Sequence, residues 1–101
     1  MGENNPKGIK RLVLDVLKPI KEPSLVEMAA ILSNVKGVEA VNITVEEVDV
    51  ETLTLEIVVE GPNIDFEELK RVIEELGSVI HSIDEVVAGS RIVEPRTITK
   101  K

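Results

Sequence analysis

Three side chains between residues 79 and 90 could do chemistry together. The segment VIHSIDEVVAGS contains the only histidine, His81, three residues before Asp84 and Glu85. Carboxylates that converge on one point bind hard cations, and a set of oxygen ligands suits Ca²⁺ or Mg²⁺ better than Zn²⁺. If Asp15 lies beside them in the fold, Asp15, Asp84 and Glu85 would form such a metal site. The alternative is that His81 and Glu85 face water while Asp84 bonds a local backbone group.

Catalysis by His81 as a general base would also need a nucleophile or a group that positions the substrate. The nearby hydroxyls belong to Ser78, Ser82 and Ser90. Nothing in the sequence arranges them as a triad, and no GxGxxG or phosphate-loop pattern is present. We therefore expect no catalytic residue and no cofactor-binding residue. An enzyme that uses His81 with Asp84 or Glu85 is the least favoured alternative.

The composition argues against several kinds of partner. The net charge is −7, and the only aromatic ring besides that of His81 is one Phe, whereas nucleic-acid surfaces use cations for phosphates and rings for base stacking. No apolar run approaches the roughly 18 residues that cross a bilayer. The absence of cysteine excludes disulfides and thiolate metal sites and fits an intracellular protein. We expect a cytoplasmic protein that binds neither nucleic acid nor membrane.

The elements that must position these side chains can be read from the hydrophobic spacing. Residues 8–19 alternate as a strand, and Ser24 and Glu27 form a capping box that starts a helix ended by Gly37. Two alternating runs on either side of a turn near 48–51 predict a hairpin. Asp65 caps a second helix, with Glu68 closing the capping box and Gly77 ending the helix. The spacing of residues 79–88 fits no single strand register, so a strand with a bulge is favoured over a helix of barely two turns.

This order predicts an α+β fold, a ferredoxin-like βαββαβ two-layer sandwich with an antiparallel sheet in the order 4-1-3-2. We expect a flexible N-terminus at 1–7, a single domain at 8–93 and a variable tail at 94–101. That tail is mildly basic, and it is either a loose segment or an arm that docks on a neighbouring subunit.

Both helices of this fold cover one side of the sheet, so the other side, here called the open face, carries the functional question. The alternation assigns to the open face Val13, Asp15, Leu17, Asn42, Thr44, Thr54, Glu56 and Val58. This surface is too apolar for plain solvent exposure and too polar for a core. We therefore expect a homo-oligomer packed through this face or its edges. The fourth strand pairs with the first, so Asp15 would approach Asp84 and Glu85.

Three motifs resemble the small archaeal proteins grouped as domain of unknown function 211. They are GIKRLVLDVLKP, KGVEAVNITVEEVD and, most specifically, IHSIDEVVAG, and the likeness runs from about residue 8 to 93. The resemblance implies a ferredoxin-like fold, closed oligomers such as hexameric rings, and an archaeal, thermophilic source. It implies no established activity. It also implies metal binding, with Ca²⁺ as the candidate ion and Asp15, Asp84 and Glu85 as the matching acids.

The leading hypothesis is a non-enzymatic oligomeric module that binds a small ligand or divalent cation, in the manner of a regulator or sensor. Amino-acid sensors of the ACT type share this topology and bind ligands between subunits, although fold alone does not give function. The alternative is a purely structural self-assembling subunit whose acids serve subunit contacts.

Overall fold

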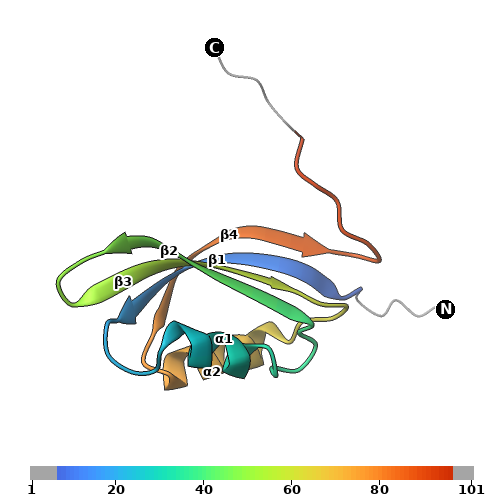
Figure 1. Cartoon of the computed structure of the whole chain (residues 1–101). Helices are drawn as coiled ribbons and strands as arrows, with labels where there is room; N and C mark the ends of the chain where they lie inside the picture. Colours follow the sequence, from blue (N-terminus) through green and yellow to red (C-terminus); the bar gives the residue numbers. More distant parts are fainter. Residues whose placement is uncertain (1–6, 97–101) are drawn as a thin grey trace, which may run out of the picture.

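The computed structural model describes residues 7–96, and the chain forms two layers. In order, the elements are β1 (Ile9–Pro19), α1 (Leu25–Leu32), β2 (Ala40–Val48), β3 (Thr52–Glu60), α2 (Phe66–Glu75) and β4 (Val79–Ala88). The strands form one antiparallel sheet in the order β2-β3-β1-β4, and both helices lie beneath it (Figure 1). This confirms the predicted ferredoxin-like fold. The terminal segments expected at 1–7 and 94–101 lie mostly outside the described residues.

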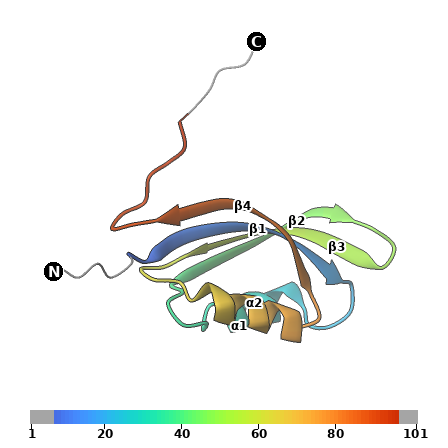
Figure 2. The ribbon, with the colours of Figure 1, turned by 180° about the vertical axis from the view of Figure 1, so that it is seen from behind.

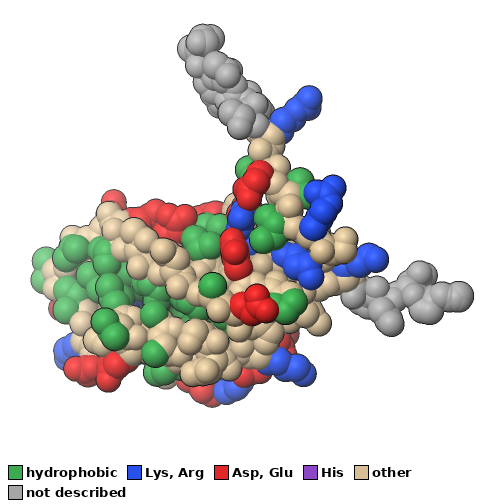
Figure 3. Space-filling model, turned by 45° about the vertical axis from the view of Figure 1, so that its right-hand side comes forward, with side chains coloured by type: hydrophobic (Ala, Val, Ile, Leu, Met, Phe, Trp, Pro, Cys, Tyr) green, Lys and Arg blue, Asp and Glu red, His purple; other side chains and the backbone are tan. Residues whose placement is uncertain are grey.

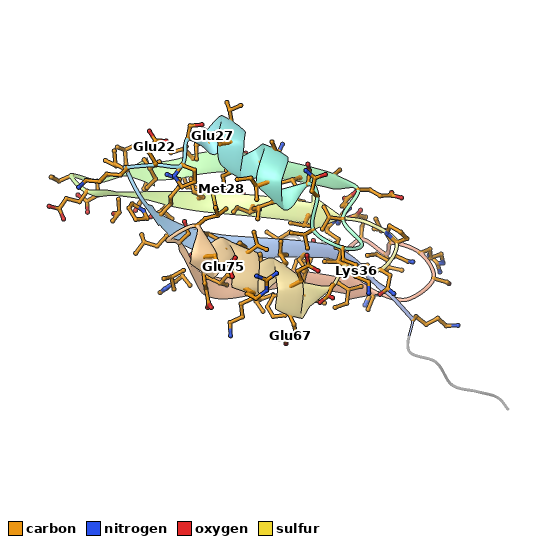
Figure 4. All side chains as sticks on the ribbon, turned by 90° about the horizontal axis from the view of Figure 1, so that it is seen from below. Glu22, Glu27, Met28, Lys36, Glu67 and Glu75 are labelled. Atoms are coloured by element: carbon orange, nitrogen blue, oxygen red, sulfur yellow. The ribbon has the colours of Figure 1, made fainter. Side chains whose placement is uncertain are left out.

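The core lies between the sheet and the helices. Alternate residues of the two central strands point into it, because successive side chains of a strand face opposite sides. The core side chains include Leu12, Leu14, Val16, Leu55, Ile57 and Val59 of the sheet, and Met28, Leu32, Leu69 and Ile73 of the helices. Seen from below in Figure 4, Met28 lies between α1 and the sheet, whereas Glu67 and Glu75 lie on the outer side of α2.

The first helix begins as predicted and ends earlier than predicted. The Ser24 hydroxyl accepts a hydrogen bond from the Glu27 amide at 3.1 Å, and the Glu27 carboxylate accepts one from the Ser24 amide at 3.0 Å. The helix stops at Leu32, not near Gly37. The reason is local: the side chains of Ser33 and Asn34 both donate to the carbonyl of Ala30, and the chain then turns.

Gly37 instead allows two loops to touch. Its φ of +85° is in the region that favours glycine, and a Cβ there would collide with the backbone of Asn63. Next to this contact the Asp65 amide donates to the Lys36 carbonyl at 3.0 Å. The Asp65 side chain caps α2 as predicted, accepting from the Glu68 amide at 3.0 Å. The return bond from the Asp65 amide to Glu68 does not form, because Lys36 takes that amide, so only half of the predicted box is present.

The fourth strand carries two bulges, which confirms the strand with a bulge. In its pairing with β1, His81 and Asp84 have no partner, whereas Ile80, Ile83 and Val86 lie opposite core residues of β1. The bulges explain the irregular pattern: apolar residues three apart face the same side because one extra residue stands between each pair. Val79, Ser82 and Glu85 consequently belong to the open face.

Candidate functional site

The open face has the composition that the alternation predicted. Across β1 and β3, Asp15 lies opposite Glu56, and the neighbouring pairs on this side are Val13 with Val58 and Leu17 with Thr54. Thr44 of β2 lies opposite Glu56 in turn. No described helix or strand covers this face, which is the upper side of the molecule in Figures 1 and 2.

The structure separates the three predicted metal ligands. Asp15 lies opposite Ser82, whose hydroxyl donates to the Asp84 carboxylate at 2.8 Å, so Asp15 and Asp84 belong to the same part of the open face. Glu85 lies opposite Val13 and accepts from the Arg11 guanidinium at 3.4 Å. Within residues 7–96, no three His, Cys, Asp or Glu side chains are grouped closely enough to hold a metal ion.

Asp15 has an unusual environment for a carboxylate. Its Oδ1 atom is buried and has no hydrogen-bond partner among the described residues. The side chain lines a hollow of about 300 Å³ in the open face. The other lining residues are Leu17, Glu47, Thr54 and His81. An unpaired buried charge is costly, so this atom favours a cationic or hydrogen-bonding partner from outside the described chain. His81 itself is exposed.

Glu46 completes a group of four carboxylates, Asp15, Glu46, Glu56 and Asp84, here called the acidic patch. Desolvation raises the pKa of Glu46 above its ordinary value. Repulsion from Glu56 raises this pKa further, and repulsion from Asp15 and Asp84 adds to the shift. The described residues offer no salt bridge to any of the four. Figure 3 shows acidic side chains along the top of the molecule, which is the open face.

Alternation places Glu46 on the same side of its strand as Asn42 and Thr44, but the predicted ligands did not include it, and the structure shows it at a bulge. In the pairing of β2 with β3, Val45 lies opposite Leu55 and Glu47 opposite Thr54, so Glu46 has no partner. Regular alternation gives no hint of the bulge itself. The usable signal was the doubled acid Glu46–Glu47 within a strand, where two adjacent acids cannot both follow one alternation.

Arg11 neutralises the other end of the open face. Its guanidinium binds both carboxylate oxygens of Glu94 at 3.0 and 2.9 Å, and its Nε donates to Glu60 at 2.9 Å. Hydrogen bonds to Glu94 and then Glu60 hold the pKa of Arg11 above its ordinary value, and the same contact lowers the pKa of Glu94. This clamp fixes the described part of the C-terminal segment to β1, a contact that the sequence reasoning did not predict.

Exposed apolar side chains gather at the hairpin end and along β4. At the free end of the β2–β3 hairpin, Val48 is 71% exposed and Val50 is 86% exposed. A hollow of about 420 Å³ lies beside them, lined by Pro19, Ile20, Lys21, Val50 and Glu51. Along β4, Val79, Ile83 and Val86 are also exposed. Figure 3 shows hydrophobic side chains gathered at the left of the molecule, toward the hairpin end.

Comparisons with known proteins find a family model and a related sequence. Among residues 7–96 no helix has the length and apolar character needed to span a membrane. A family model described as DUF211, uncharacterized ArCR, matches residues 10–101. The chain is also similar to the uncharacterized protein MJ0319 of Methanocaldococcus jannaschii. The two are 52% identical over 87 residues, which is 86% of this chain and 89% of that protein.

Proposed function

The chain belongs to the archaeal family DUF211, and we propose that it is a non-enzymatic, self-associating module whose acidic patch binds a divalent cation or a small cationic ligand. The proposal rests on one observation above all. Asp15 presents to a hollow in the open face a buried carboxylate oxygen that has no hydrogen-bond partner among residues 7–96.

The charge distribution around Asp15 supports a cation as the partner. The acidic patch brings four carboxylates together with no salt bridge to a basic side chain in the described chain. Desolvation, and after it repulsion from the other three, raises the pKa of Glu46. A divalent ion would relieve this repulsion. Oxygen ligands favour Ca²⁺ or Mg²⁺, both of which also accept water or a neighbouring molecule as further ligands. Residues 7–96 of one copy do not group three such ligands, so the remaining ligands would come from those sources.

The exposed apolar residues support self-association. The hairpin end and the β4 edge are different surfaces, and a contact between them would join copies head to tail. Head-to-tail contacts close into rings when the rotation between copies permits it. The proposed assembly is therefore a ring of the hexameric kind that the family resemblance suggested.

A thermal-shift titration tests the cation. CaCl₂ or MgCl₂ at a hundred times its dissociation constant would stabilise the folded chain by about 2.7 kcal/mol, and therefore raise the melting temperature by about 10 °C or more. Asp15→Asn removes the ionised carboxylate at the hollow and should abolish most of this shift.

The matched control is Glu67→Gln, which removes an acid on the outer side of α2, away from the open face (Figure 4). It should keep the full shift. NaCl at equal ionic strength controls for screening. If neither cation, nor free amino acids, nor small polyamines raise the melting temperature of the unaltered chain, the ligand-binding part of the proposal is wrong.

The second candidate is a purely structural subunit, favoured by the extent of exposed apolar surface at the hairpin end and along β4. The variant Asp84→Asn distinguishes the structural subunit from the ligand-binding module. A variant that loses self-association while its cation response is unchanged supports the structural subunit. A variant that loses the cation response and keeps the native mass supports the ligand-binding module.

A further inference from the structure

The segment that follows β4 has a charge opposite to that of the rest of the chain. Residues 95–101, here called the basic arm, contain three basic and no acidic side chains, whereas residues 7–94 contain nine basic and eighteen acidic ones, a net charge of −9. The basic arm also contains Ile98 between two threonines. Its mixture of cations and apolar groups is complementary to the open face, where Val13 and Leu17 alternate with Asp15.

The base of the basic arm is fixed. Glu94 is held by both of its carboxylate oxygens to Arg11, at the end of the open face where β1 begins. From there the described residues rise away from their own sheet, as both ribbon views show (Figures 1 and 2). Val93 is 55% exposed and Arg96 is exposed, so these two side chains are free for a contact with another copy.

These observations exclude one simple way of covering the open face. Two open faces packed directly on each other would bring two acidic patches together, and like charges in an interface cost several kcal/mol. A basic segment between them would remove that cost. Seven residues span at most about 25 Å when extended, and the four residues from Arg11 to Asp15 along β1 span roughly 13 Å. The basic arm is therefore long enough to reach from the end of an open face to its acidic patch.

We propose that the basic arm of one copy docks on the acidic patch of a neighbouring copy. The neighbour is the favoured acceptor because the described residues that follow the Glu94–Arg11 contact rise away from their own sheet. Arg96, Lys100 and Lys101 pair with carboxylates of the patch, and Ile98 packs against its apolar residues. This inference rests on the proposed self-association and adds a contact to the one between the hairpin end and the β4 edge. It makes the basic arm a competitor of cations for the same carboxylates.

Disulfide trapping tests the contact directly, because the natural chain has no cysteine. One full-length variant carries Thr99→Cys in the basic arm. A second, distinguishable by mass, carries Thr44→Cys, an exposed position opposite Glu56 on the open face. Mild oxidation of the mixture at low salt should give the mixed dimer as the main cross-linked product. A single chain with both cysteines, at high dilution, should remain mostly uncross-linked.

Charge reversal tests whether the basic side chains of the arm cause the docking. Arg96→Glu with Lys100→Glu and Lys101→Glu should lower the mixed-dimer yield about tenfold, since each exposed charge pair adds a fraction of a kcal/mol and three are lost. The control reverses three exposed basic residues away from the open face and the hairpin end: Lys36→Glu, Lys70→Glu and Arg71→Glu. This control makes the same change in net charge and should keep the yield within about twofold, because its charges lie outside the proposed contact.

Three results would overturn the inference: no mixed dimer, equal losses in the two triple variants, or efficient cross-linking within one dilute chain. The oxidation is done without added divalent cation, so its outcome is read separately from the cation titration. A mixed dimer without any cation response leaves the inference standing and removes the ligand from the proposed function. A cation response without a mixed dimer overturns the inference and leaves the ligand in the proposed function.

Discussion

Bulges place three of the chemically active side chains. Glu46, His81 and Asp84 are each the extra residue at a register shift, in β2 for the first and in β4 for the other two. A bulge bends its strand and redirects a side chain, and bulges are common next to functional sites for that reason. Here they bring carboxylates from two edge strands toward Asp15 and Glu56 on the central strands, which a regular sheet would not do.

The repulsion within the acidic patch should be visible as a pH dependence of stability. The folded-state pKa of Glu46 is raised, so the folded chain holds this proton more tightly than the unfolded chain does. Stability therefore falls as the pH rises from the ordinary carboxyl range through the raised pKa. Glu46→Gln removes this loss and should increase the melting temperature at pH 7.

The gain should shrink as the pH is lowered and disappear once Glu46 is protonated in both states. Melting curves of both proteins from pH 3 to pH 8 measure it, with Glu67→Gln as the control for loss of one surface charge. A gain that is the same at every pH would show that Glu46 acts through something other than its charge.

Lys18 is a cation where the alternation requires a core residue. It is 1% exposed, and its ammonium donates to the carbonyls of Pro19 at 3.0 Å and Lys21 at 2.7 Å. The buried ammonium thereby gives a hydrogen-bond donor to two backbone carbonyls at the end of β1 and in the segment that follows it. Lys18→Met keeps the apolar stem and leaves both carbonyls without this donor, so it should lower the free energy of unfolding by about 1–3 kcal/mol.

Urea unfolding measures this loss, and Lys21→Met serves as the comparison because the Lys21 side chain is exposed. If Lys18→Met is as stable as the unaltered chain or more so, the desolvation of the ammonium outweighs its two hydrogen bonds.

At the scale of elements, two glycines with positive φ allow the cost of backbone strain to be measured apart from the cost of a close contact. Gly37 has a φ of +85° and lies against Asn63, whereas Gly77 has a φ of +90° and open space, with no atom within 4 Å of the place that an added Cβ would take. Gly77→Ala should cost only the left-handed conformation, roughly 1–2 kcal/mol. Gly37→Ala adds a backbone collision and should cost about 1–3 kcal/mol more. Urea unfolding of both variants tests this, and equal costs would mean that the two loops move apart freely.

The sequence predicted the elements well where local chemistry decides them. The capping box at Ser24, the cap at Asp65 and the stop at Gly77 follow from side-chain types at fixed spacing, and all three are present. The early end of α1 could not be predicted in the same way. It depends on hydrogen bonds from Ser33 and Asn34 to one carbonyl, residues that are also tolerated within helices.

The candidate site was predictable only in part, because local patterns do not show which long-range contacts form. Alternation placed Asp15 and Glu56 on the open face, and pairing of β4 with β1 placed Asp84 near Asp15. It could not show that Arg11 draws Glu85 away, or that Glu46 enters the acidic patch at a bulge. Both depend on long side chains and on register shifts, which are set by tertiary contacts.

At the scale of the whole molecule, the hairpin end is the surface on which self-association can be tested. Val48→Ser with Val50→Ser changes two residues that are already exposed, so the stability of one copy should change by less than about 0.5 kcal/mol each. If these valines are buried between copies, the dissociation constant should rise about tenfold or more. Sedimentation velocity at micromolar concentration measures it.

Val26→Ser is the matched control, since Val26 is 81% exposed on α1. It should leave the association unchanged. A monomer for the unaltered chain at the same concentration would contradict the proposed assembly.

The two bulges of β4 also affect the tendency of this protein to aggregate. β4 is an outer strand, and a long regular outer strand is a template on which misfolded chains add to form amyloid. The extra residues at His81 and Asp84 put the free backbone groups of β4 out of step with any incoming strand. Concentrated solutions of the native protein should therefore stay free of fibres seeded at this edge, despite its exposed isoleucine and valines. The same irregularity that gathers the acids thus protects the solubility of the chain.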